Sequence, residues 1–404
     1  MSFLLPPVSF LTPTTTTTTT PLTLAYIDRT RNRSRAMGVM DSGGQAFDRA
    51  QELKQFEESK LGVKGLLDSG LASLPPLFIH PPKTLSDLRP ARPPARPPCP
   101  GSIPTIDLSG CCDSARRPSV IGEVACAACE LGFLQVVNHG VPAEVLDCTI
   151  VAVKAFHEQL AEAKARIYRR QMDTGVSFFS NVDLFLSKAA SWRDTLQVRL
   201  GPKLADTEEI LKVCRNEVLA WNQQVERLGS ILLGLLSEGL GLSPGKLQEL
   251  TCLDMRMMVG HYYPYCPQPD LTVGLTSHAD PGVITVLLQD QVGGLQVKHG
   301  DEWVDVKPVL GALVVNIGDI IQIMSNDEYK SIDHRVLANP SQEPRVSIAV
   351  FCNPSNCENE FGPFPELVSL DKPAAFRQFT LNEYMRRFFT KELDGKSLIN
   401  YFRA

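Results

Sequence analysis

The chain has 404 residues, a formal net charge of −5 at pH 7 and 43% hydrophobic residues, which suits one large domain or two medium ones. This balance gives no basic field, so we expect no nucleic-acid partner. No uninterrupted apolar run approaches the roughly 20 residues of a membrane span, so we expect no membrane segment. The eleven cysteines are scattered and odd in number, which favours free thiols in a reducing compartment.

Residues 1–40 differ from the rest of the chain in composition. An unbroken threonine tract runs from Thr14 to Thr20, four arginines follow it, and Asp28 is the only acid. Such a segment lacks the periodic apolar surface of a folded element, so we expect a disordered leader. Its hydroxyl-rich, arginine-rich composition also fits an organellar transit peptide. We therefore expect a cytoplasmic protein, with plastid targeting as the alternative, and a single domain over residues 41–404.

The first part of that domain, to about residue 250, is expected to be mainly helical. Apolar periodicity and helix-forming residues predict helices over 45–60, 120–131, 143–171, 207–240 and 244–249, and strands over 102–108 and 133–137. The Pro- and Arg-rich stretch 89–100 is expected to be an extended connection.

Cys126 and Cys129 form a Cys-x-x-Cys pair inside the second of these helices. The spacing allows a redox or metal half-site, but no second pair stands at zinc-ribbon spacing. We favour two small buried residues on one helix face.

From Met255 onward the pattern changes to short apolar or alternating runs separated by Gly, Pro, Asn and Asp. Strands are predicted at VGHYYP, LTVGLTSH, VITVLLQD, LQVKH, EWVDV, ALVVNIGD, IIQIMSN, HRVLAN and RVSIAVFCNP. The apolar segment 311–324 is thus expected to form buried strands. Many short strands at regular spacing indicate a barrel or jelly roll. The predicted fold is therefore α+β, with a jelly-roll core at about 251–355, flanking helices mostly from the N-terminal half, and a helical C-terminal tail.

Three of the core residues have the spacing of a metal site. His278 and Asp280 are two residues apart, and His334 follows 54 residues after Asp280. Residues i and i+2 of a strand point to the same face, so the first two can aim at one ion. Two histidines and one carboxylate with open positions form the facial triad of non-haem Fe(II) oxygenases. A zinc hydrolase is the chemical alternative, since zinc accepts the same ligands.

The other histidines have weaker claims to a metal. His80 lies in a proline-rich loop and His139 in a strand-ending turn. His157 lies on a charged helix and His299 at a polar turn. The role of His261 is left undecided.

A second pair follows at strand spacing. Arg345 comes eleven residues after His334, and Ser347 comes two later. They offer a bidentate fork and a hydroxyl to one carboxylate, and Tyr263 could add a second hydroxyl. A zinc hydrolase has no evident use for this pair. The alternative for Arg345, a surface salt bridge, is disfavoured by the apolar run VSIAVF around it.

Together these residues resemble the plant 2-oxoglutarate/Fe(II)-dependent dioxygenases of specialised metabolism, over roughly residues 45–400. The similarity runs through GFLQVVNHGVP, GHYYPYCPQPDL, SHADPGVITVLLQD, NIGDIIQIMSNDEYKSIDHRVLAN and RVSIAVFCNP. The segment ELKQFEESKLGVKGLLDSGLASLPPLFIHPP resembles the amino terminus of the 1-aminocyclopropane-1-carboxylate oxidase homologue clade, which includes alkaloid hydroxylases such as desacetoxyvindoline 4-hydroxylase.

The resemblance implies that His278, Asp280 and His334 bind Fe(II), and that Arg345 and Ser347 hold the distal carboxylate of 2-oxoglutarate with help from Tyr263. It implies 2-oxoglutarate and O2 as cosubstrates, ascorbate as reductant, and release of succinate and CO2 as a substrate is hydroxylated.

The expected partner is a small molecule such as an alkaloid, flavonoid or steroid, bound by a monomer. An apolar, aromatic pocket would suit it, and the candidate residues are Phe178, Phe179, Val182, Leu184, Phe351 and Asn353. Two alternatives remain: an ethylene-forming oxidase that keeps the triad but does not use 2-oxoglutarate, and a non-catalytic jelly-roll binding protein.

Overall fold

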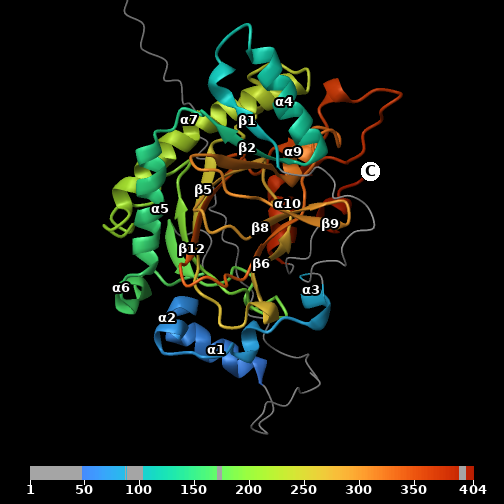
Figure 1. The fold of residues 1–404 in the computed structure, drawn as a ribbon. Helices are drawn as coiled ribbons and strands as arrows, with labels where there is room; N and C mark the ends of the chain where they lie inside the picture. The colour runs from blue at the N-terminus through green and yellow to red at the C-terminus, as the bar shows by residue number, and fades with distance from the viewer. Residues whose placement is uncertain (1–47, 87, 89–102, 171–174, 391–396) are drawn as a thin grey trace, which may run out of the picture. The chain divides into compact units, whose positions relative to one another are not determined.

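The computed structural model describes residues 48–86, 88, 103–170, 175–390 and 397–404 (Figure 1). The expectations for the leader and for the extended connection at 89–100 lie outside these ranges. The helices are α1 (Arg49–Ser59), α2 (Gly62–Asp68), α3 (Pro82–Ser86), α4 (Arg117–Glu130), α5 (Ala143–His157), α6 (Ala161–Ala165), α7 (Arg215–Gly239), α8 (Lys246–Glu249), α9 (Asp319–Met324), α10 (Leu381–Phe389) and α11 (Ser397–Asn400).

The strands of the described residues fall into two main sheets and one small pair. They are β1 (Thr105–Asp107), β2 (Phe133–Val137), β3 (Val176–Phe179), β4 (Asp194–Arg199), β5 (Met255–Tyr263), β6 (Val273–His278), β7 (Ile284–Gln289), β8 (Leu295–His299), β9 (Glu302–Asp305), β10 (Leu313–Ile317), β11 (His334–Leu337), β12 (Arg345–Asn353), β13 (Glu360–Phe361) and β14 (Phe379–Thr380). The large sheet has the order β1-β2-β10-β7-β12-β5-β4-β3, the smaller one has the order β6-β11-β8-β9, and β13 pairs with β14.

The two main sheets pack face to face. One buried cluster contains Phe133, Tyr263 and Val314 from the large sheet together with Leu275 and Val297 from the small one. Two sheets with side chains meeting between them are the architecture of a jelly roll. The predicted jelly-roll core with flanking helices is confirmed.

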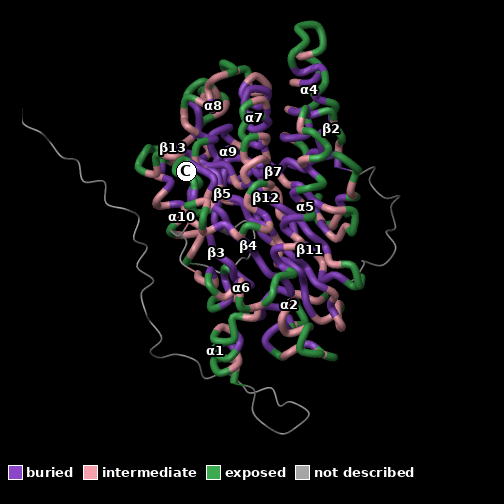
Figure 2. The backbone as a smooth tube through the Cα atoms, turned by 90° about the vertical axis from the view of Figure 1, so that its left-hand side faces the viewer, coloured by how far each residue is buried: buried purple, intermediate pink, exposed green. Residues whose placement is uncertain are grey.

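Helices cover the outer face of the large sheet. Helices α4, α5 and α7 contact one another or the strands, and α5 lies against β4, β5, β7 and β12, as Figures 1 and 2 show. Helix α7 buries one stripe of its surface, including Val218, Trp221, Val225, Leu228 and Leu232. That spacing of three and four residues is the amphipathic pattern of the sequence. Because these helices cover the outer face of the large sheet, its inner face is the one available for a functional site.

Some predicted elements differ from the observed ones. The helix predicted over 207–240 begins only at Arg215, and the one predicted over 143–171 is divided into α5 and α6. The mainly helical part also contributes four strands, β1 to β4, to the large sheet.

The prediction of strands throughout 311–324 is wrong in its second half. Strand β10 ends at Ile317, and the residues of the predicted strand IIQIMSN begin inside helix α9, which runs from Asp319 to Met324. Every residue of α9 is buried. A short helix that is buried on all sides has no amphipathic period, so its sequence cannot be told from that of a buried strand.

The expectation that Cys126 and Cys129 are both buried is also wrong. Both lie on α4, but Cys126 is exposed and Cys129 is only partly buried. The buried stripe of α4 is formed instead by Val120, Val124 and Ala127 with their neighbour Ala128. Every cysteine in the described ranges is free, in agreement with the expectation of free thiols.

The N-terminal helices are held to the core by a buried carboxylate. Asp194 of β4 accepts hydrogen bonds from the backbone N–H groups of Val63 and Lys64, at 2.8 and 2.9 Å, and from the hydroxyl of Ser180 at 2.6 Å. Gly62 has φ +71°, and a Cβ on it would lie 2.6 Å from an Asp194 oxygen. Only glycine fits this approach, and the contact directs the Asp194 side chain out of the sheet interior.

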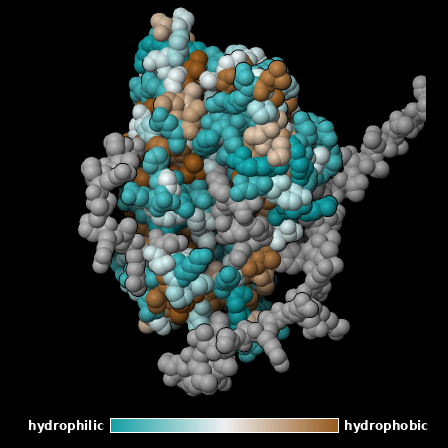
Figure 3. Space-filling view, turned by 90° about the vertical axis from the view of Figure 1, so that its right-hand side faces the viewer, coloured by the Kyte–Doolittle hydropathy of each residue, from teal (hydrophilic) through white to brown (hydrophobic). Residues whose placement is uncertain are grey.

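No helix within the described ranges is long and apolar enough to cross a membrane. On the face drawn in Figure 3, the described surface is mostly hydrophilic, with apolar residues scattered among the polar ones.

Candidate metal centre and cosubstrate site

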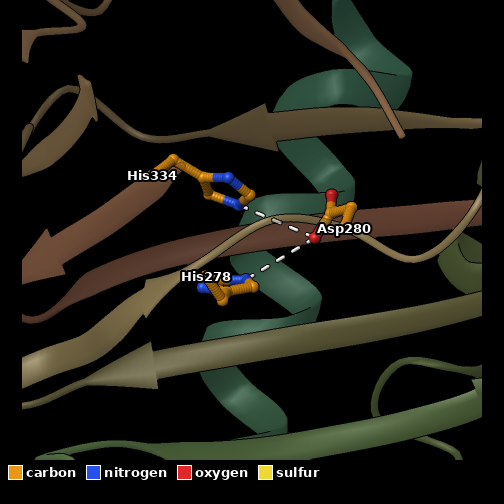
Figure 4. A group of neighbouring side chains, drawn as sticks. All are labelled: His278, Asp280 and His334. Carbon is orange, nitrogen blue, oxygen red and sulfur yellow. Dashed lines mark ion pairs between the residues drawn. The ribbon is translucent and has the colours of Figure 1, made fainter. Parts of the chain in front are cut away.

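The structure brings the three predicted metal ligands together inside the jelly roll (Figure 4). His278 ends β6, His334 begins the neighbouring strand β11, and the two residues are paired across the sheet. Asp280 follows two residues after β6. Its Oδ1 lies 3.5 Å from His278 Nε2 and 3.7 Å from His334 Nε2. The three ligand atoms are within 4.8 Å of one another, and all three residues are buried.

The donor set fits one divalent first-row ion. Atoms bound to such an ion at about 2.1 Å and at right angles lie about 3 Å apart, so each of the two separations between Asp280 and a histidine needs to close by less than about 1 Å. Each histidine also orients its other nitrogen toward a backbone carbonyl: His278 Nδ1 is 2.9 Å from Thr276 O, and His334 Nδ1 is 3.3 Å from Ile332 O. These contacts favour the tautomer that leaves Nε2 free to bind a metal.

Neighbouring side chains hold the carboxylate in place. Asp280 Oδ2 accepts hydrogen bonds from Thr285 Oγ1 at 2.6 Å and from Asn316 Nδ2 at 2.7 Å. Thr285 lies on β7 and Asn316 on β10, where the two residues are paired. With Oδ2 occupied in this way, Oδ1 faces the histidines. Burial alone would raise the pKa of Asp280, but its electrostatic interactions with His334 and His278 and its hydrogen bonds outweigh burial and lower that pKa. The carboxylate is therefore ionised at neutral pH, as a metal ligand must be.

A second polar group lies on β12, on the inner face of the large sheet, which faces the small sheet that carries the two histidines. Arg345 is 2% exposed and donates hydrogen bonds to Ser347 Oγ and to Gln289 Oε1, both at 2.9 Å. Its guanidinium stands over the ring of Tyr263, 4.9 Å from the centroid. The structure thus places Arg345, Ser347 and Tyr263 together. Arg345 forms no salt bridge with a described carboxylate, and its Nε has no hydrogen-bond partner among the described residues. Its charge does act on Asp290, where it partly offsets the rise in pKa that burial causes in that carboxyl.

Strand pairing explains why these residues meet. Arg345 of β12 lies opposite Tyr263 of β5. The next inward-facing row runs through Phe179, Thr195, His261, Ser347 and Gln289, on five adjacent strands. Because alternate residues of a strand share a face, all of these positions point into the jelly roll.

His261, which the sequence left open, lies in this second row and not beside the metal ligands. Its Nδ1 is 3.0 Å from Thr195 Oγ1. Desolvation, reinforced by the charges of Arg193 and Arg345, holds the pKa of His261 well below its ordinary value. The ring is therefore neutral at physiological pH.

The remaining histidines have structural surroundings. His139 Nε2 is 2.9 Å from Gly311 O, which confirms the expected structural hydrogen bond at the strand-ending turn. His157 is fully buried rather than lying on a solvated helix face, with its Nε2 3.0 Å from Gly260 O. His80 is also buried, and His299 is exposed at the end of β8.

The six substrate-pocket candidates are not brought together. Phe178 faces outward and packs against Phe156, His157 and Tyr168. Leu184 is fully buried in a cluster with Phe78 and Trp192.

Val182 is partly exposed. Phe179 lies in the inward-facing row of Thr195, and Phe351 is paired with Thr285, next to the ligand carboxylate. Asn353 follows Phe351 on the same face and has its Oδ1 unpaired among the described residues. Phe179, Phe351 and Asn353 therefore remain candidates, whereas Phe178 and Leu184 belong to the packed core.

Several residues of the site did not stand out in the sequence: Thr285, Gln289, Asn316, Thr195 and Arg193. Thr285 and Gln289 are polar residues four positions apart in the mostly apolar run VITVLLQD, so they lie on one face of the strand. A buried strand with polar residues on one face indicates a polar interior. This pattern can be seen in the sequence, but it does not predict which side chains Thr285 and Gln289 contact.

Comparisons with known proteins agree with this geometry. Residues 255–354 match the 2OG-Fe(II) oxygenase superfamily, and residues 103–216 match the family described as non-haem dioxygenase in morphine synthesis N-terminal. The chain is 44% identical over 361 residues to 1-aminocyclopropane-1-carboxylate oxidase homolog 1 of Arabidopsis thaliana, covering 89% of this chain and 97% of that protein. Homolog 4 of the same plant is also 44% identical, over 359 residues.

Two solved structures are similar over most of the fold. The crystal structure of JOX2 in complex with 2OG, Fe and JA has a TM-score of 0.73 and 33% identity, covering 85% of this chain and 97% of that one. The crystal structure of the dioxygenase for auxin oxidation from rice has a TM-score of 0.64 and 25% identity, covering 75% and 100%.

A jelly roll that carries two histidines and an aspartate at its centre is the arrangement of a non-haem Fe(II) oxygenase. The protein is an oxidoreductase. The chain belongs to the 2OG-Fe(II) oxygenase superfamily, among the plant dioxygenases named as 1-aminocyclopropane-1-carboxylate oxidase homologues.

Proposed function

We propose that the protein is a hydroxylase of a small plant metabolite, in which His278, Asp280 and His334 bind Fe(II) and Arg345, Ser347 and Tyr263 hold 2-oxoglutarate. The product is the hydroxylated metabolite, with succinate and CO2. The observation that carries the proposal is the buried Arg345 guanidinium, which lacks an ion pair among the described residues and points into the same jelly-roll interior as the metal ligands.

A buried cation without a counter-ion is costly, so its presence needs a reason. Ser347 and Gln289 fix the plane of the guanidinium through its two terminal nitrogens. Arginine presents a planar fork that matches a carboxylate. The distal carboxylate of 2-oxoglutarate would supply both the charge and the matching shape, and the Tyr263 hydroxyl would donate to it as well.

The iron, when bound, activates O2 with the electrons of 2-oxoglutarate. The protein's own residues orient and isolate the reacting groups. Thr285 and Asn316 fix the Asp280 carboxylate, and the carbonyl contacts of the two histidines fix their rings. The apolar cluster between the sheets, which includes Phe133, keeps water from the site. Such positioning is the contribution of the protein in cofactor chemistry.

The primary substrate would lie against Phe179, Phe351 and Asn353, the pocket candidates that face the interior. Two solved relatives point to small molecules, since one is in complex with JA and the other is named for auxin oxidation. We further propose that ascorbate serves as reductant and that the enzyme acts as a cytoplasmic monomer.

Stoichiometric succinate formation tests the proposal. Protein reconstituted with Fe(II) and 2-oxoglutarate is supplied with a panel of alkaloids, flavonoids, steroids and plant acids, and succinate and product are both quantified. We expect one succinate per hydroxylated product. Asp280→Ala should abolish turnover with the fold retained, and Asp305→Ala, an exposed carboxylate on β9, serves as the matched control. Full activity of iron-reconstituted Asp280→Ala would refute the metal assignment.

The ethylene-forming alternative gives a different result in the same assay. It predicts ethylene from 1-aminocyclopropane-1-carboxylate in the absence of 2-oxoglutarate, and no succinate. The buried Arg345 fork argues against it, because that reaction has no 2-oxoglutarate carboxylate to bind.

A further inference from the structure

A second buried arginine faces the same interior. Arg193 is 3% exposed and lies one residue before β4. The next residue, Asp194, points outward to the start of α2, and the preceding residue, Trp192, packs in the cluster of Phe78. Because Asp194 points outward and neighbouring residues of a strand alternate in direction, Arg193 points inward, where its guanidinium contacts the Gly274 carbonyl.

The neighbours of Arg193 place it beside the cosubstrate site. Asp194 is paired with Tyr262, so Arg193 lies next to Tyr263, which is itself paired with Arg345. An Arg193 terminal nitrogen donates to Gly274 O at 3.2 Å, on the strand that ends with a metal ligand. Arg193, Tyr263 and Arg345 therefore form one row across three adjacent strands.

Arg193 forms no salt bridge within the described part of the chain. Its hydrogen bond goes to the uncharged Gly274 carbonyl, and its Nε has no hydrogen-bond partner there. Asp194 is already engaged by two backbone N–H groups and the Ser180 hydroxyl. Burial lowers the pKa of Arg193, and the charges of Tyr263, Asp183 and Asp194 oppose that effect without forming a salt bridge with it. A guanidinium in this position still carries its charge.

The charges of the loaded site leave this cation uncompensated. A divalent metal ion and Arg345 are balanced by Asp280 and the two carboxylates of 2-oxoglutarate. Arg193 remains as the extra positive charge on the interior face. A buried charge is normally paired, so the missing partner is expected to arrive with a ligand.

We propose that Arg193 binds the carboxylate of an acidic primary substrate, and so makes the enzyme selective for organic acids over neutral compounds of the same shape. This inference rests on the proposed function, because 2-oxoglutarate must occupy Arg345 for Arg193 to be the cation left over. Arg193 then determines specificity without contacting the metal.

The test uses full-length protein loaded with Mn(II) and 2-oxoglutarate, so that turnover is prevented and Arg345 is occupied. Phenylacetate and phenylacetamide are the probes, because they share a shape and differ in charge. We expect phenylacetate to raise the Tm and phenylacetamide to leave it unchanged. In Arg193→Met the Kd for phenylacetate should rise at least about tenfold, as for loss of a charged hydrogen bond, and Arg193→Lys should retain part of the affinity.

Two further measurements separate this role from others. Arg193→Met should keep the Tm of the ligand-free wild type or exceed it, because an apolar side chain replaces an unpaired buried charge; a large fall in Tm would indicate a structural role instead. The 2-oxoglutarate affinity of both variants, read from the absorption of the anaerobic Fe(II) complex, should be unchanged.

The proposal is overturned by equal stabilisation with both probes, by no stabilisation of the wild type, or by a loss of 2-oxoglutarate affinity in the Arg193 variants. Absence of the Fe(II)–2-oxoglutarate absorption in the wild type would contradict the proposed function itself, and this outcome is independent of the probe comparison.

Discussion

Replacing Arg345 with lysine tests the cosubstrate site most directly. The arginine uses one terminal nitrogen for Ser347 Oγ and the other for Gln289 Oε1, each at 2.9 Å, and this fixes the plane in which its fork meets a carboxylate. Lysine keeps the charge but offers one nitrogen on a flexible stem. The lysine nitrogen can donate to a carboxylate oxygen or to Ser347 and Gln289, but it cannot make all of these hydrogen bonds in one plane.

The expected magnitude follows from the number of bonds. Losing one of two charge-assisted hydrogen bonds to the carboxylate costs about 1.5–3 kcal/mol, which corresponds to a rise of about 10- to 150-fold in the Kd for 2-oxoglutarate. The Kd for the primary substrate should change much less, because the arginine does not contact it in the proposed arrangement.

The assay is an anaerobic titration of the Fe(II) protein with 2-oxoglutarate, followed by its absorption, together with the KM values in the succinate assay. Arg256→Lys is the matched control: this arginine is also buried on the large sheet, but it bonds to Asn222 and to the Leu253 carbonyl. If Arg345→Lys leaves the 2-oxoglutarate dependence unchanged, the cosubstrate assignment is refuted, and the ethylene-forming reaction or a structural role is favoured.

Three further predictions concern other parts of the chain. Thr285→Val removes a hydrogen bond to the ligand carboxylate and should weaken Fe(II) binding about 10- to 100-fold, measured by competition with a chelator, whereas Thr149→Val on α5 should leave that affinity unchanged. Burial holds the pKa of His157 at about 3 against an ordinary 6.5, so the unfolded chain binds the extra proton, and stability should fall by about 1 kcal/mol per pH unit below 6.5. His157→Gln should remove this residue's share of the pH dependence and leave a shallower decline, and a parallel decline of Tm in wild type and variant between pH 7 and 5 would contradict it. A chain that starts at Met40 should keep the Tm and the turnover rate of the full chain, since the leader's composition offers little apolar surface to bury; a large loss of stability would show that the leader contributes to the fold.

Much of the fold could be predicted from strand and helix patterns. Strand β2 was predicted with its observed ends, and β12 was predicted as the apolar run around Arg345. Amphipathic helix α7 was found because one side of it faces solvent. Helix α9 was missed because it is buried on every side. Hydrophobic periodicity reveals a helix only when one face is exposed to solvent and the other is buried.

The sequence by itself determined which residues could act together within one strand. The two-residue spacings of His278 with Asp280 and of Arg345 with Ser347 place each pair on one face, because the backbone of a strand alternates its side chains.

Only the tertiary structure decided which strands are neighbours. It pairs His278 with His334, brings Thr285 and Asn316 to the Asp280 carboxylate, and sets Arg193 beside Tyr263. These partners are far apart along the chain. Their register depends on how two whole sheets close over a common core, and no local pattern encodes that arrangement.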